Sequence, residues 1–284
     1  MTSNPTTTMT APTATTTRTA ARRRRPVQAP RLSRAAYAST AVVAFVVLVA
    51  VWWLLTALGT VKPIFLPSPA AVAQAVLEQA TNGQLWGDLG ASVYRVMAGY
   101  LLAVVMALPL GVLTGALPRV EAALEPLMDF IRYMPVVAFV PLTIIWVGTG
   151  DAQKFLIIWL GTFFQLVLMV SDAVRTVPVA YQNLGATLGL SRMQILLRIV
   201  FLASAPRVWD ALRICLGWAW TWVVVAELVA ATTGMGYRIT VGQRYLATDL
   251  IIGYVIVLGA LGLIFDQIMR RAGQAIFRYE RSAR

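Results

Sequence analysis

The residue types that carry most enzyme chemistry are scarce in this sequence. One acidic residue, however, lies in an apolar stretch, where burying a charge costs free energy. Glu227 is the only charged residue between Arg213 and Arg238, in an otherwise apolar stretch. The chain contains no histidine, which excludes Ser-His-Asp triads, Cys-His pairs and HExxH zinc sites. Its two lysines, Lys62 and Lys154, do not lie in a GxxxxGK[ST] phosphate-binding loop. We therefore expect neither catalysis nor a metal site nor ATP binding by this chain.

The composition explains why an isolated acid matters here. Of the 284 residues, 58% are hydrophobic and 13% are charged, and the mean hydropathy is +0.71. Soluble domains are about half apolar and about one quarter charged. These values predict an integral membrane protein and exclude secreted, ordinary cytosolic and nucleic-acid-binding proteins, despite a net charge of +12. Cys215 stands alone in an apolar run and is interpreted as a packing residue.

The gaps between charged residues predict six membrane-spanning helices, so the expected fold class is an all-α integral membrane protein. A span needs about 20 apolar residues. The charge-poor gaps are 34–62, 95–119, 132–151, 154–172, 213–238 and 249–266.

The first 34 residues differ from the rest of the chain. Residues 1–34 are rich in threonine and arginine and have little to bury, so we expect a disordered tail. The apolar run that follows is longer than the core of a signal peptide and predicts a retained first helix over 35–62.

The distribution of basic residues predicts the orientation. Cytoplasmic loops of membrane proteins carry an excess of lysine and arginine. With the tail inside, alternation across six helices places nineteen of the 24 basic residues in the cytoplasm. The five on the outside are Lys62, Arg95, Lys154, Arg238 and Arg244. Both termini, including the basic segment 271–284, are therefore expected to be cytoplasmic.

Three connections stand out between the predicted spans. The external segment 63–90 opens with Leu66-Pro67-Ser68-Pro69, whose prolines forbid a regular helix before Ala70; an interfacial amphipathic helix is expected after it. Residues 148–154 form a short hairpin, which predicts that the third and fourth helices are antiparallel neighbours. The largest cytoplasmic loop is 174–208.

That loop has its own helical pattern. Pro178 suits a helix start, Gly189 permits a sharp corner, and Ser191 with Gln194 forms a capping box for a second short helix. Pro206 is expected to mark the entry to the fifth span. A loop this long is either a helical hairpin packed under the bundle or a docking element for a partner.

The loop resembles the EAA loop of bacterial ABC importer permeases. Asn183-Leu184-Gly185, then three residues, Gly189, nine residues and Ile199 match the spacing of Glu-Ala-Ala, Gly and Ile in that family. Asn183 replaces the usual glutamate, so it keeps a hydrogen bond but not a charge pair.

Other segments are similar to the nitrate, sulfonate and taurine branch of that family. They are Leu66-Pro67-Ser68-Pro69, Ser92-Val93-Tyr94-Arg95-Val96, Pro109-Leu110-Gly111, Trp146-Val147-Gly148, Val225-Ala226-Glu227 and Gly234-Met235-Gly236. The resemblance implies a type I ABC importer permease fold over 88–270, in a bacterial inner membrane.

The resemblance also implies partners. Two ABC ATPase subunits would hold ATP and magnesium, an external solute-binding protein would deliver the cargo, and a second copy of this chain would complete the path. This chain itself would bind no cofactor. The implied ATPase-coupling residues are Asn183, Leu184, Gly185, Leu188, Gly189, Ser191, Arg192 and Ile199.

Several residues are candidates to line or gate the path. Gln165 beside Phe163 and Phe164, and Trp218 with Trp222 one turn apart, are either lining residues or ordinary packing residues. Glu227 is expected either to gate the path, with Arg95 or Arg238 as its partner across the two copies, or to be a structural carboxylate bonded to Thr232 or a helix N-terminus.

The sequence does not identify the transported solute. A nitrate-, sulfonate- or taurine-like anion is favoured by the resemblance, with a neutral or heterocyclic vitamin precursor as the alternative. A secondary transporter is a weaker hypothesis, because the chain offers no second buried acid-base partner for a proton relay.

Overall fold

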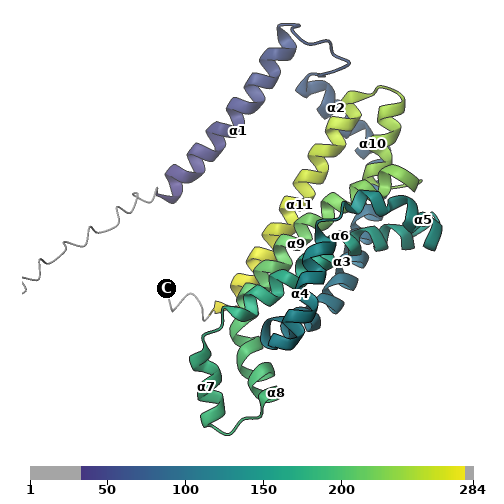
Figure 1. The fold of residues 1–284 in the computed structure, drawn as a ribbon. Coiled ribbons are helices and arrows are strands. Elements are labelled where there is room, and N and C mark those ends of the chain that lie inside the picture. Colours follow the sequence, from purple (N-terminus) through teal and green to yellow (C-terminus); the bar gives the residue numbers. More distant parts are fainter. Residues whose placement is uncertain (1–32, 279–284) are drawn as a thin grey trace, which may run out of the picture. The chain divides into compact units, whose positions relative to one another are not determined.

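A computed structural model describes residues 33–278 of the chain, and every regular element within them is a helix (Figure 1). The predicted disordered tail lies almost entirely outside the described residues. The chain divides into two compact units, residues 1–48 and 49–284. Helix α1, Arg34–Ala57, is apolar along its whole length and crosses this division.

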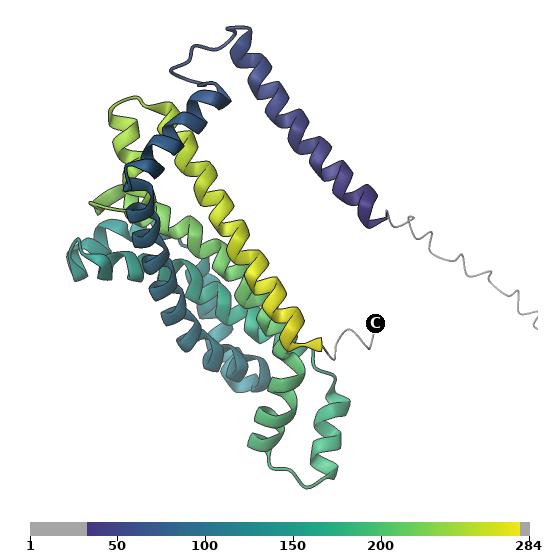
Figure 2. The ribbon, with the colours of Figure 1, turned by 180° about the vertical axis from the view of Figure 1, so that it is seen from behind.

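Three long helices form the core of the second unit. Helices α3 (Gln84–Ala116), α6 (Asp151–Arg175) and α9 (Phe201–Ala230) pack side by side, and α11 (Thr248–Ile276) lies along α9 (Figures 1 and 2). The bundle has two ends. The α10 end carries α2 (Pro69–Thr81) and α10 (Met235–Arg244), and the α7 end carries α7 (Val179–Thr187) and α8 (Arg192–Ile195).

Glycines let α3 approach α6 closely. A Cβ atom at Gly99 would lie 2.7 Å from the Cβ of Ile158, and one at Gly111 would lie 2.6 Å from the Cβ of Val170. At Gly115 the nearest atom would be the carbonyl oxygen of Ser171, at 2.6 Å. Small residues are the usual means by which membrane helices bring their backbones together.

The third predicted span is broken, so the prediction of one continuous helix there was wrong. Helix α4 (Pro118–Arg132) is followed by a 3₁₀ turn at Val136–Phe139 and by α5 (Val140–Val147), and the pair bends by 84°. Pro135 lies at the break and cannot donate the hydrogen bond that a continuing helix needs.

The fifth span begins earlier and ends earlier than predicted. Pro206 lies inside α9 rather than at its entry, and the five-residue π-helical segment Leu196–Val200 leads into α9 without a loop. At the other end α9 stops at Ala230, and Gly234, at φ 110°, precedes the separate helix α10.

Helix α10 ends with a residue that its backbone does not favour. The N–H of Ala247 donates to the carbonyl of Gly242 and that of Leu246 to Gln243, which is the Schellman pattern. Glycine normally occupies the left-handed position of this motif, and here it is Leu246, with φ 54°.

Within the described residues, five helices are long and apolar enough to span a membrane, or six if the bent α4–α5 pair is one span. The predicted fold class, an all-α integral membrane protein with six spans, is therefore confirmed. Helix α2 begins at Pro69 behind the side-chain cap of Ser68, one residue before the predicted start.

Candidate functional site

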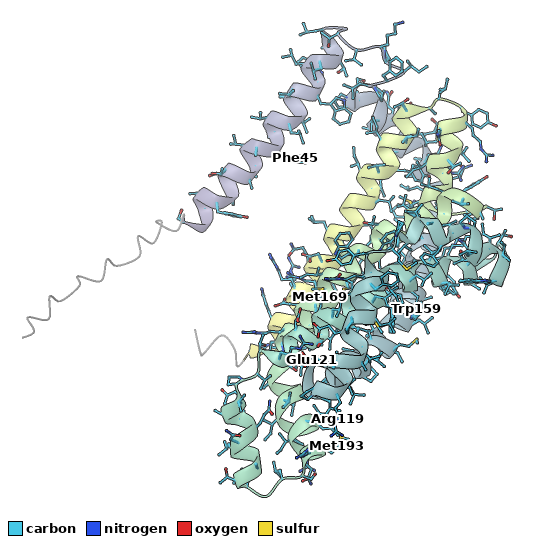
Figure 3. The ribbon with its side chains drawn as sticks, in the orientation of Figure 1. Phe45, Arg119, Glu121, Trp159, Met169 and Met193 are labelled. Atoms are coloured by element: carbon cyan, nitrogen blue, oxygen red, sulfur yellow. The ribbon has the colours of Figure 1, made fainter. Side chains whose placement is uncertain are left out.

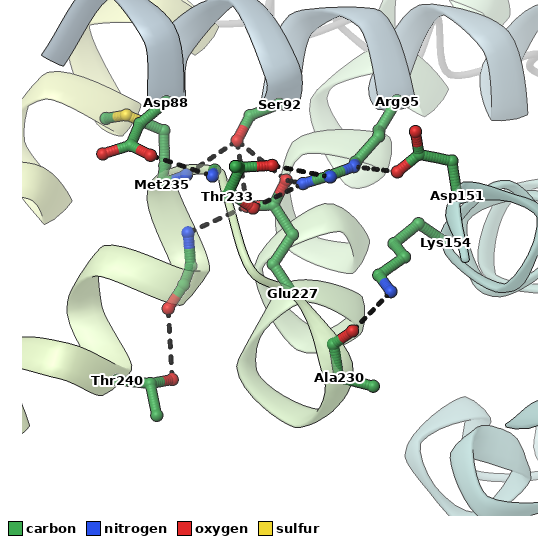
Figure 4. A network of polar contacts seen from close by, with 12 residues as sticks. Asp88, Ser92, Arg95, Asp151, Lys154, Glu227, Ala230, Thr233, Met235 and Thr240 are labelled. Atoms are coloured by element: carbon green, nitrogen blue, oxygen red, sulfur yellow. Dashed lines mark hydrogen bonds and ion pairs between the residues drawn. The ribbon is translucent and has the colours of Figure 1, made fainter. Parts of the chain in front are cut away.

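Glu227 lies at the centre of a buried polar network at the α10 end (Figure 4). Its side chain is fully buried, and the residue is 1% exposed. Ser92 on α3 donates its hydroxyl to the carboxylate at 2.9 Å, and Arg95 donates from Nη1 at 2.8 Å. The backbone N–H of Gly236, in the first turn of α10, donates at 2.8 Å. Three donor groups therefore supply hydrogen bonds to this buried carboxylate.

Arg95 extends the network to α6 and to the turn between α9 and α10. Its Nε donates to Asp151 at 2.7 Å, and its Nη1 donates to the carbonyl of Thr233 at 2.6 Å. Nη2 donates to the Thr233 hydroxyl at 3.0 Å. One guanidinium therefore joins α3, α6, α9 and the turn, using the fork of donors that arginine offers.

Asp88 fixes the start of α10 from the other side. It accepts from the N–H of Gly234 at 3.0 Å, from Arg238 at 2.8 Å and from the Tyr254 hydroxyl at 3.2 Å. Two buried acids, Asp88 and Glu227, thus meet the positive N-terminal end of α10. Partial burial opposes the charge of Arg238, but the hydrogen bond and charge of Asp88 outweigh it and raise the pKa of this guanidinium.

Lys154 is buried nearby without a carboxylate of its own. It is 1% exposed, and its Nζ donates to the carbonyls of Thr149 and Ala230. Ala230 is the last residue of α9, so the ammonium compensates the negative C-terminal end of that helix. Arg95 and Lys154, counted as loop charges from the sequence, are both interior residues.

The contacts of Glu227 can be compared with each interpretation of this residue. Arg95 pairs with it inside one chain, while Arg238 pairs with Asp88 instead. The expected bond to a helix N-terminus is present, but the hydroxyl comes from Ser92 rather than Thr232. Three acids, Asp88, Asp151 and Glu227, meet three bases, Arg95, Lys154 and Arg238. These charged side chains join α3, α6, α9 and α10 within one chain.

Sequence reasoning missed three members of this network. Asp88 lies two turns and Ser92 one turn before Arg95 on one face of α3, a spacing that the sequence displays. Asp151 is the first residue of α6 and follows directly on a short loop, so the sequence suggested only a solvent-exposed charge. Within residues 33–278, no group of histidine, cysteine, aspartate and glutamate could hold a metal ion.

Some of the predicted path residues gather around a separate cavity of about 860 Å³. Its walls come from the α4–α5 bend, α6 and α9, and they include Gln165, Trp218 and Trp222. Met169, labelled in Figure 3, lines the same cavity. The amide of Gln165 makes no hydrogen bond within the described part of the chain. Arg95 and Glu227, the other two candidates, do not line it.

The width of this cavity depends on one glycine. The indole of Trp222 lies over Gly161, and a Cβ at Gly161 would be 2.3 Å from the indole Nε1. Arg132 also lines the cavity, paired with Asp129 at 3.0 Å and stacked over Tyr133. No acidic residue is among the lining residues.

The predicted coupling loop is a helical hairpin at the α7 end. Gly189, at φ 75°, forms the corner, and the N–H of Leu190 closes onto the carbonyl of Gly185 at 3.1 Å. Ser191 and Gln194 form the capping box that the sequence predicted.

Gly185 holds this hairpin together. It is buried, and a Cβ there would lie 2.6 Å from the Cδ1 of Ile199 in the π-helical segment. The other predicted coupling residues are exposed, with Leu188 at 71%. They are Asn183, Leu184, Leu188, Gly189, Ser191 and Arg192. The hairpin therefore presents these residues on its surface, at the opposite end of the bundle from α10 (Figure 1).

Comparison with known proteins gives consistent matches. Residues 99–278 match the family model described as binding-protein-dependent transport system inner membrane component. The taurine transport system permease protein of Escherichia coli K12 is 32% identical over 229 residues, which cover 79% of this chain and 83% of the relative. A putative aliphatic sulfonates transport permease protein of Bacillus subtilis is 29% identical, over 83% of this chain and 86% of its own length.

A solved structure shares the fold. The MetNI methionine ABC transporter, in inward-facing conformations, matches with a TM-score of 0.60 and 18% sequence identity. The match covers 68% of this chain and 95% of the matched chain. It supports the architecture alone.

Breaking the buried ion pair should be far more costly than breaking a surface pair. We expect Arg95→Ala to destabilise the protein by about 3–5 kcal/mol, because it leaves Glu227 buried with an uncompensated charge. Arg175→Ala, at an exposed pair with Glu125, should cost at most about 1 kcal/mol. Apparent melting temperatures of the two variants in detergent measure the difference.

A double-mutant cycle with Glu227→Gln separates the pair from general damage. If the losses of Arg95→Ala and Glu227→Gln were simply additive, the two residues would not be coupled and the network described above would be wrong.

Proposed function

The chain belongs to the family of binding-protein-dependent transport system inner membrane components, and from that premise we propose that it forms the path by which an ATP-driven importer moves a small anion. The cavity between the α4–α5 bend, α6 and α9 carries this proposal. It is deep, largely apolar, and lined by Gln165, Trp218 and Trp222.

The charge of the cavity wall favours an anion. Arg132 and the unbonded amide of Gln165 can donate to oxygen atoms, and no lining residue is acidic. Three relatives are named for the transport of taurine, aliphatic sulfonates and bicarbonate, and each of these solutes carries an anionic group. Aromatic side chains on the same wall would also suit a neutral heterocycle, so such a vitamin precursor is the alternative cargo.

We propose that α7 docks onto a separate ATPase subunit, which holds ATP and magnesium, while this chain binds no cofactor. The exposed apolar side chains Leu184 and Leu188 suit a groove on such a partner. Displacement of α7 would reach the membrane helices through Gly185, the π-helical segment and α9, which are continuous in packing.

The remaining assignments complete the importer. A second copy of the chain would supply the opposite wall of the path, and an external solute-binding protein would deliver cargo at the α10 end. The excess of arginine at the α7 end supports placing that end, and both termini, in the cytoplasm of a bacterial cell.

Transport by reconstituted complex tests the function. Proteoliposomes containing this chain and its ATPase, with the binding protein added outside, should take up taurine, butanesulfonate or bicarbonate only when they contain ATP. Uptake of a neutral pyrimidine instead would favour the alternative cargo. Uptake by this chain alone, driven by an ion gradient, would show a secondary transporter.

Gly161→Ala should narrow the path. The added methyl group collides with the indole of Trp222, so the ring must shift and repack against the cavity, and we expect uptake to fall about tenfold or more. Gly217→Ala on α9 is the matched control, because a Cβ there meets nothing within 4 Å. Equal uptake by both variants would remove the cavity from the path.

Leu188→Asp and Arg192→Glu should release the ATPase subunit without unfolding the chain, because both side chains are exposed on the hairpin. Leu246→Asp and Arg244→Glu are controls at the α10 end, and aspartate tolerates the left-handed backbone of position 246. Copurification of the tagged ATPase is the measurement. Full retention by the hairpin variants would rule out α7 as the docking element.

A further inference from the structure

Four exposed arginines lie together where α9 begins and α11 ends, outside both the cavity and the coupling hairpin. They are Arg207, Arg270, Arg271 and Arg278, and each is within two residues in sequence of Trp209, Met269 or Phe277. The Trp209 indole donates to the carbonyl of Met269 at 2.8 Å and meets the ring of Phe277 edge-on. Gly273 allows this contact, since a Cβ there would lie 2.6 Å from the indole.

These arginines lack the partners that others have. Arg95, Arg132, Arg175, Arg213 and Arg238 each form a salt bridge within the chain. None of the four arginines around Trp209 does so within residues 33–278. Within residues 33–278, Asp210 is the acid beside them that forms no salt bridge, and Asp266 is already bound to Arg213 at 3.3 Å. The patch therefore keeps an excess of three positive charges.

The depth of the patch identifies its surroundings. Helix α11 has 29 residues, which is about 44 Å at 1.5 Å per residue, whereas the hydrocarbon core is about 30 Å thick. Counting about 20 residues from Leu250 reaches Met269, so Arg270 and Arg271 emerge at the level of the phospholipid headgroups. Tryptophan is enriched at this level, and Trp209 is fixed there by its bond to Met269.

We propose that this patch, Arg207, Arg270, Arg271 and Arg278 around Trp209, binds the headgroup of an anionic phospholipid. Arginine forks match phosphate oxygens, and basic pockets between membrane helices are suited to such lipids. The docking hairpin lies beyond it along the bundle axis, at the far tip of the α7 end (Figures 1 and 2). This site does not depend on which solute the importer carries.

Lipid binding to the purified importer complex tests the proposal. Native mass spectrometry should show phosphatidylglycerol bound more tightly than phosphatidylcholine. The double variant Arg270→Gln, Arg271→Gln should weaken phosphatidylglycerol binding about 25-fold, at about fivefold for each arginine. Arg270→Lys with Arg271→Lys keeps the charge and should keep most of the binding.

Arg244→Gln is the matched control, because Arg244 is an arginine without a salt bridge at the α10 end. Three results would overturn the proposal. The first is equal binding of the two lipids by the unmodified complex, or an equal loss in the control variant. The second is displacement of phosphatidylglycerol by millimolar inorganic phosphate, which would indicate a free-anion site. The third is loss of the ATPase subunit from the double variant with lipid binding unchanged, which would make the patch a protein contact.

Discussion

A charge inside the bilayer must be compensated within the protein, and the pair between Glu227 and Arg95 is where this chain meets that requirement most fully. Neither residue can be removed alone without leaving the other uncompensated. Their partners come from α3, α6, α9 and the first turn of α10, so the pair fixes four elements at one point. The α10 end therefore forms a platform in which this charged network lies beside an apolar cluster of Leu85, Met235 and Tyr254.

The opposite end is organised by a different principle. The hairpin of α7 and α8 is held by Gly185 against Ile199 and by local caps, while its outer face is left exposed. The π-helical segment joins it directly to α9, the helix that also contributes Glu227 and two tryptophans of the cavity. Under the proposed function, one continuous helix touches the docking element, the path and the platform. A partner that moves the hairpin acts on a helix whose far end is fixed.

The membrane spans and the hairpin could be predicted from the sequence, because they depend on residues close together in the chain. The spans follow from charge-free gaps, and the corner at Gly189 and the box at Ser191 follow from backbone and capping preferences that need no tertiary partner. Residue type alone failed where the outcome depends on distant contacts. Pro206 is accommodated within α9 while Pro135 lies at a break, and Leu246 takes the backbone conformation of a glycine.

The buried polar network around Glu227 was also hard to predict, because its contacts join residues that are distant in sequence. Lys154 resembled a loop residue because it follows a hairpin, yet it is buried between Thr149 and Ala230, which is 76 residues away in sequence. Glu227 was recognisable as a candidate because an isolated acid in an apolar run stands out. Its partner Ser92, one residue among many hydroxyls, is marked only by its position one turn before Arg95.

The glycine contacts between α3 and α6 restrict how this protein can move. At Gly99 and Gly111 the side chains of Ile158 and Val170 pack directly onto the backbone of α3, and glycine has no side chain that could rearrange as the helices slide. A small slip would drive Ile158 or Val170 into the neighbouring helix, and a larger one would have to cover a whole helical turn. We therefore expect α3 and α6 to move together as one rigid unit, so that conformational change takes place in the helices that pack against them.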